Sequence, residues 1–330
     1  MPAVYITGAN GFIAQHIIKI LLEKGYTVIG TIRSKEKGEK LSKIINNPNF
    51  QYEIVPELNA PDAFHESLKK HQDIEYIVHS ASPVTYTVND PELDIIIPAL
   101  KGTENILNGT LLLPKLKKFI LTSSDSAIYS NIDERNNKFT FDESSWNNVA
   151  YEEGKKDPVG GYYVSKALGE KKAWKFLETH QNAFQLTTVC PSYVFGNQAF
   201  KVDPKNLNFS NSYVGDLLTA KNDQFENEIG GFIDVVDVAK AHVFAIENDS
   251  VIGKRLFLNN GKFSVQMILD IINKNFPQLN LIKGNVGSGQ KDVEVLANVN
   301  NEFTKKLLPW QFTSLETSVI NTVQQILDSK

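Results

Sequence analysis

The sequence predicts an α/β protein with a doubly wound parallel sheet and a smaller C-terminal domain that binds the substrate. Three observations predict this fold. A glycine-rich turn follows the first apolar run, strand-like and helical segments alternate over the first two-thirds of the chain, and the alternation ends after Gly196. Strands that are apolar on both faces fit a parallel sheet, because helices then cover both faces.

The alternating segments can be assigned one by one. Short apolar runs predict strands at Ala3–Thr7, Thr27–Arg33, Tyr52–Pro56, Tyr76–Ala81, Phe119–Ser123 and Gln185–Pro191. Segments with helical periodicity lie between them, at Gly11–Lys24, Lys35–Ile45, Ala60–Lys70, Pro91–Leu111 and Gly161–Glu178. Strictly alternating strands and helices predict βαβ units, and therefore parallel pairing.

The pattern changes in the last third of the chain. Residues 197–230 are polar and rich in asparagine, whereas Phe232–Glu247 returns to a strand and a helix. The remainder holds a short strand at Arg255–Leu258 and helices at Ser264–Phe276 and Leu315–Leu327. We therefore assign residues 1–196 and 231–250 to the dinucleotide-binding domain, and residues 197–230 and 251–330 to the substrate-binding domain.

The turn after the first strand predicts a dinucleotide site. Gly8 permits a tight turn, Gly11 lets the backbone approach a pyrophosphate, and Ala14 is small enough for the helix to pack on the strand. The free N–H groups and the positive dipole end of the following helix attract phosphate. The fold is thus of the Rossmann type, with cofactor contacts expected along the turn at Gly8, Asn10, Gly11, Phe12 and Ile13.

The end of the second strand indicates which nicotinamide cofactor binds. An NAD site usually has an acidic residue there to hold the ribose hydroxyls. This strand instead ends at Arg33, with Lys37 nearby, and Glu36 lies on the predicted helix. A guanidinium can bind a 2′-phosphate through two hydrogen bonds. The sequence therefore predicts NADPH, the alternative being a solvated charged turn.

Tyr162 and Lys166 are the strongest candidates for catalysis. Their spacing places both on one face of the predicted helix. A phenol of ordinary pKa near ~10 is a weak proton donor at neutral pH, and a nearby ammonium is expected to lower the pKa of Tyr162. Ser123 and Ser124 end the fifth strand, where a hydroxyl could bind the substrate oxygen. Tyr163 is a competitor, but it has no lysine four residues on.

Four motifs together resemble the extended short-chain dehydrogenases/reductases. They are Thr7–Ala14, Thr122–Ser124, Tyr162 with Lys166, and Phe232–Ala239. Within that superfamily the chain is similar to the dihydroflavonol-reductase-like branch, which includes yeast NADPH-dependent methylglyoxal and aldehyde reductases. The resemblance covers nearly the whole chain.

The resemblance also implies roles for individual residues. It implies Ser124, rather than Ser123, as the partner of Tyr162 and Lys166 in catalysis. It implies cofactor contacts by Glu57, Leu58, Ala81, Pro191 and Val194. Two positions depart from the family pattern: Ala99 stands where many members have asparagine, and Asp125 where relatives often have an aromatic or small residue.

The substrate is expected to meet Val84, Asp125, Tyr129 and Tyr193, together with residues 197–230. An unpaired buried carboxylate is costly, so Asp125 is expected to be solvated at the mouth of the cleft. The alternative is that Asp125 is paired, or that it turns away and caps a turn.

Composition limits the class of protein. The net charge of -4 gives no reason to expect nucleic acid or membranes as partners. One cysteine, Cys190, and no visible export signal favour the cytoplasm. The histidines show no metal-ligand spacing. The leading interpretation is an NADPH-dependent carbonyl reductase, as a monomer or homodimer. The alternatives are a sugar-nucleotide epimerase or dehydratase and a non-catalytic NADP-binding sensor.

Overall fold

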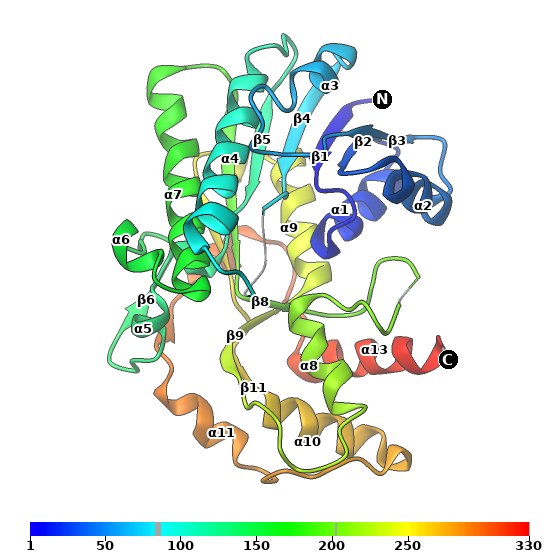
Figure 1. The fold of residues 1–330 in the computed structure, drawn as a ribbon, viewed down its shortest axis with the longest axis vertical. Helices are drawn as coiled ribbons and strands as arrows, with labels where there is room; N and C mark the ends of the chain where they lie inside the picture. The colour runs from blue at the N-terminus through cyan, green and yellow to red at the C-terminus, as the bar shows by residue number, and fades with distance from the viewer. Residues whose placement is uncertain (83–86, 202, 330) are drawn as a thin grey trace.

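The computed structural model describes residues 1–82, 87–201 and 203–329. Figure 1 shows a large sheet flanked by helices on both sides, and below it a smaller part to which the C-terminal segments contribute. None of the helices in the described ranges is long and apolar enough to cross a membrane.

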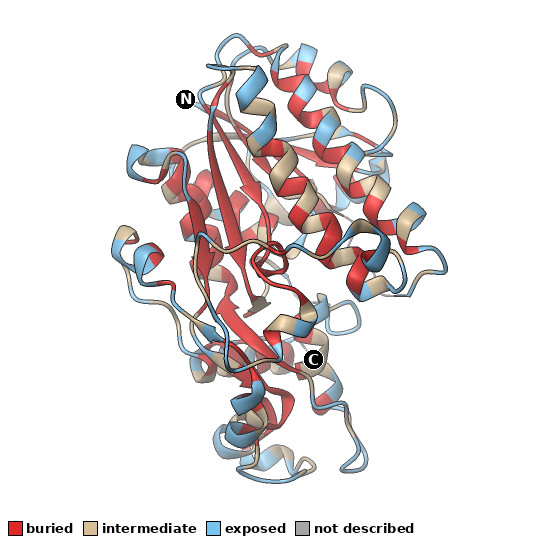
Figure 2. Ribbon diagram, turned by 90° about the vertical axis from the view of Figure 1, so that its left-hand side faces the viewer, coloured by how far each residue is buried: buried red, intermediate tan, exposed pale blue. Residues whose placement is uncertain are grey.

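The main sheet has seven strands, and every pairing within it is parallel. In spatial order they are β10 (Arg255–Leu258), β7 (Gln185–Pro191), β5 (Lys118–Thr122), β4 (Ile74–His79), β1 (Ala3–Thr7), β2 (Thr27–Ile32) and β3 (Phe50–Ile54). Strands β1, β5 and β10 are buried along their whole length, and Figure 2 shows that burial dominates the sheet. The predicted fold class is confirmed, and the strand bounds lie close to the predicted ones.

Helices cover both faces of this sheet, as the apolar strands require. One face packs against α1 (Phe12–Glu23), α2 (Lys35–Ile45) and α9 (Val235–Glu247). The other packs against α3 (His65–Lys70), α4 (Ile97–Thr110) and α7 (Pro158–Thr179). A π-helical turn at Glu92–Ile96 precedes α4, so the segment that was predicted as one helix has two parts.

Strand β10 corrects the predicted place of one segment. The sequence analysis placed Arg255–Leu258 in the smaller domain, but it pairs with β7 from Arg255 opposite Thr188 to Leu258 opposite Pro191. All of its residues are buried, and β10 covers what would otherwise be the open edge of β7. A strand this short carries no sequence signal for its partner. The rest of the division into two domains stays a prediction.

The smaller part has its own sheet and its own core. Its strands, in spatial order, are β11 (Lys262–Ser264), β9 (Ile229–Asp234) and β8 (Tyr193–Phe195). They pack with α8 (Phe209–Leu217), α10 (Val265–Asn275) and α13 (Leu315–Asp328). The remaining elements are short: α5 (Asn131–Glu134), α6 (Tyr151–Gly154), α11 (Gly289–Asp292), α12 (Glu302–Leu307), and the parallel pair β6 (Thr140–Phe141) and β12 (Asn298–Val299).

The strand order locates the site. The chain leaves β1 toward β2 and β3 on one side, and continues with β4, β5 and β7 on the other. In open parallel sheets, ligands bind beyond the carboxyl ends of the strands at such a reversal. The turn after β1 and the segment after β4 therefore mark the expected binding crevice.

Candidate active site

The turn after β1 is shaped for close approach to a phosphate. Gly8 has a positive φ of 70°, and a Cβ there would lie 3.1 Å from the Cα of Ala81. A Cβ on Gly11, which precedes α1, would lie 3.1 Å from the carbonyl oxygen of Gly8. The Gly8 N–H donates to Thr31 Oγ1 at 3.0 Å, which fixes the turn to β2. Side chains at these glycines would fill the space, so the geometry fits a dinucleotide phosphate on the N-terminus of α1.

Two cavities meet at this turn. The first, of about 300 Å³, is lined by Gly8, Asn10, Gly11, Thr31, Ile32, Arg33, Lys37, Val55, Leu58, Ser80, Ala81 and Ser82. The second, of about 440 Å³, contains further residues expected to bind the cofactor: Phe12, Ile13, Tyr162, Lys166, Pro191 and Val194. Gly11, Ser80 and Ser82 line both cavities. Together the cavities form a groove, in which the first cavity could hold one half of a dinucleotide and the second cavity the other half.

The predicted cofactor residues lie along this groove, with one exception. Glu57 is exposed and lines neither cavity, whereas its neighbour Leu58 lines the first. Arg33 and Lys37 are exposed at the rim of the first cavity. Within the described ranges, no ion pair occupies either cation, so both charges are available to a phosphate.

The expected catalytic residues gather in the second cavity, which is lined by Ser124, Tyr162 and Lys166. Ser124 directly follows β5, and its Oγ accepts a hydrogen bond from the backbone N–H of Ser126 at 3.2 Å. Tyr162 and Lys166 lie one turn apart on α7, and the Lys166 Nζ is 5.7 Å from the centre of the Tyr162 ring. The sequence spacing therefore does place these side chains in a common site.

Helix α7 begins where it does for local reasons. Pro158 stands in its first turn, where its missing N–H costs nothing. The Asp157 side chain accepts a hydrogen bond from the Gly160 N–H at 2.9 Å and caps the helix. This start sets which residues of α7 face the cavity.

The pKa values in the site differ from the expectation. Burial raises the pKa of Tyr162 to about 12; a hydrogen bond with Ser124 lowers it and the charge of Asp125 raises it. Burial lowers the pKa of Lys166 to about 8, although Cys190 and Glu170 oppose this shift. The expected lowering of the Tyr162 pKa below its ordinary value is therefore not found, because burial raises that pKa. Tyr162 remains protonated at neutral pH and can donate its proton.

The hydroxyl of Tyr163, the competing candidate, is hydrogen-bonded to another residue. Its hydroxyl donates to Glu134 Oε2 at 2.9 Å, and burial raises its pKa well above the ordinary value. The ring is buried against Ile128, Tyr129, Cys190 and Phe257. This arrangement supports Tyr162, rather than Tyr163, as the proton donor.

The structure corrects the expected environment of Asp125. Asp125 is buried, with 7% of its surface exposed, and it is not solvated at a mouth. Its Oδ2 accepts from the Tyr129 hydroxyl at 2.6 Å and its Oδ1 from Ser124 Oγ at 3.0 Å. Burial raises the pKa of the carboxyl, and the hydrogen bonds partly oppose this shift. Paired donors thus make burial possible.

The other expected substrate residues divide into three cases. Tyr193 lines the second cavity and donates to Glu228 at 3.4 Å. Tyr129 is buried behind Asp125 and does not line either cavity of the groove. Val84 lies outside the described residues. From residues 197–230, Asn208, Phe209 and Ser210 reach the cavity at the start of α8.

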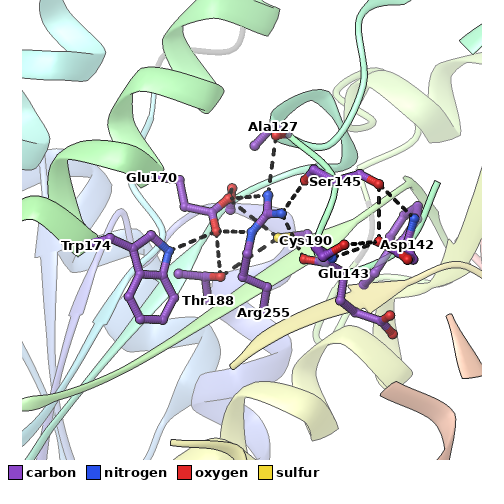
Figure 3. Close-up of polar contacts among 12 residues, drawn as sticks. Ala127, Asp142, Glu143, Ser145, Glu170, Trp174, Thr188, Cys190 and Arg255 are labelled. Atoms are coloured by element: carbon purple, nitrogen blue, oxygen red, sulfur yellow. Dashed lines mark hydrogen bonds and ion pairs between the residues drawn. The ribbon is translucent and has the colours of Figure 1, made fainter. Parts of the chain in front are cut away.

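A buried ion pair between Glu170 and Arg255 escaped the sequence analysis (Figure 3). Glu170 lies one turn beyond Lys166 on α7, and its Oε1 accepts from Arg255 Nε of β10 at 2.6 Å. Its Oε2 accepts from Ser123 Oγ at 2.6 Å. Burial raises the pKa of Glu170, but Arg255 and the hydrogen bonds outweigh it and hold that pKa below its usual value.

The guanidinium of Arg255 is satisfied on all sides. Its Nη1 donates to the carbonyl oxygens of Glu143 and Ser145, and its Nη2 donates to that of Ala127 at 3.3 Å. Its Cζ lies 3.8 Å from the centre of the Trp146 ring. The pair therefore connects α7, β5, β10 and the segment after β6. The one available sequence signal was that Glu170 continues the spacing of Tyr162 and Lys166.

Two buried histidines form hydrogen bonds with threonine side chains of the main sheet. His79 contacts Thr7 Oγ1 at 2.8 Å, and His242 contacts Thr122 Oγ1 at 2.8 Å. In the part of the chain that the structure describes, no group of three or more His, Cys, Asp and Glu residues could hold a metal ion. These histidines therefore support the strands that carry the site.

Comparison with known proteins gives consistent matches. The NADPH-dependent methylglyoxal reductase of Saccharomyces cerevisiae is 41% identical to the chain and covers 98% of both chains. The crystal structure of yeast methylglyoxal/isovaleraldehyde reductase with NADPH has a TM-score of 0.94 at 40% identity, covering 99% of this chain and 98% of that one. The Gre2 protein of Candida albicans with NADPH also has a TM-score of 0.94, at 38% identity, covering 100% of this chain and 99% of that one.

A family model, described as the NAD dependent epimerase/dehydratase family, matches residues 4–258. This range contains the phosphate-binding turn, the strand-end serines, the Tyr162 and Lys166 pair, and β10. The chain therefore belongs to the NAD dependent epimerase/dehydratase family.

Proposed function

We propose that this protein reduces the carbonyl group of small aldehydes, ketones or dicarbonyls, with NADPH as the hydride donor. The observation that carries the proposal is the second cavity, where Ser124, Tyr162 and Lys166 meet beside the phosphate-binding turn. The similarity to reductases that act with NADPH supports it.

The residues divide the reaction between them. When bound, the reduced nicotinamide supplies a hydride to the carbonyl carbon. Tyr162 gives its phenolic proton to the oxygen that gains charge, and Ser124 orients that oxygen by hydrogen bonding. Lys166 binds the ribose and supplies positive charge next to the phenol that loses its proton. Pro191 and Val194 bound the nicotinamide end of the cavity.

The cofactor preference rests on the first cavity. Arg33 and Lys37 line it from the end of β2 and the start of α2, where the 2′-phosphate of NADPH would lie. A guanidinium and an ammonium there stabilise a phosphate by charge-assisted hydrogen bonds. This arrangement favours NADPH over NADH.

A kinetic assay with the purified protein tests the proposal. NADPH oxidation is followed by absorbance with methylglyoxal and with a panel of simple aldehydes and ketones, and chiral analysis identifies the alcohols. We expect stoichiometric conversion of NADPH and carbonyl. A sugar-nucleotide epimerase would interconvert its substrate without net loss of NADPH, and a sensor would bind NADPH without turnover. Either result would overturn the proposal.

We also propose that the protein is cytoplasmic and acts as a monomer or a homodimer. The lone cysteine, Cys190, is buried, and this supports the expected cytoplasmic location. Both a monomer and a homodimer are compatible with the catalytic residues proposed here, because one chain supplies all of them.

A further inference from the structure

Asp125 places a carboxyl group in the wall of the substrate cavity. It is buried, and it lines the second cavity beside Ser124 and Tyr162. Tyr129 donates to one of its oxygens and Ser124 to the other. Ser192 and the backbone N–H of Ser126 also hydrogen-bond with this carboxyl. Because a carboxylate accepts about four hydrogen bonds, a donor on a ligand must take the place of one of these partners.

Aromatic residues of the same cavity also offer contacts to a cation. Tyr193 and Phe209 line the same cavity, with their ring centres 6.3 Å apart. Aromatic faces attract cations within about 6 Å of the ring centre. Among the described residues that line the cavity, Lys166 is the one that carries a positive charge, and it is assigned to the ribose. A carboxylate on the substrate would therefore lie near Asp125 with no cationic side chain of the described cavity lining left to pair with it.

The distances limit where the recognised substituent must be. Ser124 Oγ has to lie about 2.7–3.0 Å from the substrate oxygen to donate to it, and it is 3.0 Å from Asp125 Oδ1. The substrate oxygen thus lies within about 6 Å of Asp125 Oδ1. An ammonium or hydroxyl group attached one or two carbons from the carbonyl carbon can therefore reach Asp125.

We propose that Asp125 determines the substrate class: it selects carbonyl compounds with an ammonium or hydroxyl donor on the first or second carbon from the carbonyl, and it disfavours carboxylates at the same place. The inference rests on the proposed function, because it assigns the recognition element of the same cavity.

Substrate binding and catalysis are coupled through Ser124 in this arrangement. In the structure the Ser124 hydroxyl donates to Asp125 Oδ1, so its proton is engaged by Asp125. A donor on the substrate that takes over Oδ1 releases the Ser124 hydroxyl for the carbonyl. The recognised substituent should therefore raise kcat as well as lower KM.

Four methyl ketones that differ in one group test the proposal. Aminoacetone, hydroxyacetone, butanone and acetoacetate carry an ammonium, hydroxyl, methyl or carboxylate group on the carbon next to the carbonyl. Their kcat/KM values with NADPH are compared in the wild type, Asp125→Asn and Glu134→Gln, at slightly acidic pH where the amine is protonated. Glu134 is the control for replacing a buried carboxyl by an amide, because it is buried but does not line the cavity.

We expect Asp125→Asn to lower kcat/KM for aminoacetone, relative to butanone, by roughly tenfold or more, as for other close charge pairs. The same variant should raise the relative kcat/KM for acetoacetate, and Glu134→Gln should leave the ranking as in the wild type. Ratios within one variant cancel a general loss of active enzyme. Equal changes for all four ketones in Asp125→Asn would overturn the inference.

A wild-type measurement covers the case in which Asp125→Asn does not fold. Isopropylammonium and isobutyrate are compared as inhibitors against butanone. Competitive inhibition by the cation and not by the anion supports the proposal, whereas the reverse order or equal inhibition contradicts it. If the wild type oxidises NADPH neither with any of the four ketones nor with methylglyoxal, the proposed function fails. If the wild type reduces all four ketones with equal kcat/KM, the inference about Asp125 is wrong, but the proposed function stands.

Discussion

The two ends of the cofactor groove are built from different kinds of residue. At the first cavity, Arg33 and Lys37 are exposed side chains on the rim. At the second, buried or half-buried groups are close enough to shift one another: Asp125 raises the pKa of Tyr162, and Glu170 raises that of Lys166. Exposed charges act almost independently, whereas buried groups in contact act as a unit. Single substitutions at the first cavity should thus change the cofactor preference with little effect on folding. Single substitutions at the catalytic end should affect folding as well as activity.

The largest effect is expected from Tyr162→Phe, at the buried end. The ring and its packing remain, but the proton donor is lost, and general acid catalysis contributes about 10²–10⁴ in rate. The NADPH dissociation constant, measured by fluorescence titration, should stay nearly unchanged. Tyr163→Phe is the control, because that hydroxyl donates to Glu134. If Tyr163→Phe reduced kcat more than Tyr162→Phe, the assignment of the donor would be wrong.

Glu170→Gln should show that the buried end supports the fold as well as the site. It leaves Arg255 as a buried charge without its counterion, a change that typically costs about 3–5 kcal/mol of unfolding free energy. Urea denaturation measures the loss. Glu316→Gln removes an exposed partner of Lys274 and should leave the urea midpoint unchanged. Equal midpoints for all three proteins would show that the pair is not structural.

The lowered pKa of Lys166 predicts a pH dependence. The free enzyme holds the ammonium below a pKa of about 8 and loses it above. Because the ammonium binds the ribose, kcat/KM for NADPH should fall as the pH rises through about 8. Lys166→Ala should have lower kcat/KM at neutral pH and should lack this descending limb. A limb that persists in Lys166→Ala would assign it to another group.

The smallest effect concerns the exposed end. The wild type should prefer NADPH over NADH by at least roughly tenfold, about 1.4 kcal/mol, and Arg33→Asp should narrow or invert that ratio. Lys35→Asp is a matched control, since Lys35 is exposed on α2 but does not line the first cavity. Equal kcat/KM values for the two cofactors in the wild type would refute the preference.

Sequence patterns predicted what depends on local periodicity. The strands from Ala3–Thr7 to Gln185–Pro191, the phosphate-binding turn and the common face of Tyr162 and Lys166 follow from repeats of a few residues. The parallel order of the sheet follows from the alternation of strands and helices.

The missed features depend on contacts between distant segments. Glu170 and Arg255 are 85 residues apart, and nothing near either one indicates its partner. Asp125 was expected in solvent because its donors could not be counted from the sequence; Tyr129, four residues on, is one of the donors that make burial possible. The pKa of Tyr162 was misjudged for the same reason, since the burial that raises this pKa could not be counted from the sequence.

The late position of Arg255 in the chain has a consequence for biosynthesis. During translation, all other strands of the main sheet emerge before β10. Until Arg255 leaves the ribosome, Glu170 has no guanidinium partner and β7 has an open edge that could pair with another chain. A nascent chain released at residue 250 would therefore contain the phosphate-binding turn and the catalytic residues but an incomplete sheet, and it would be a substrate for chaperones and proteases rather than a minimal enzyme.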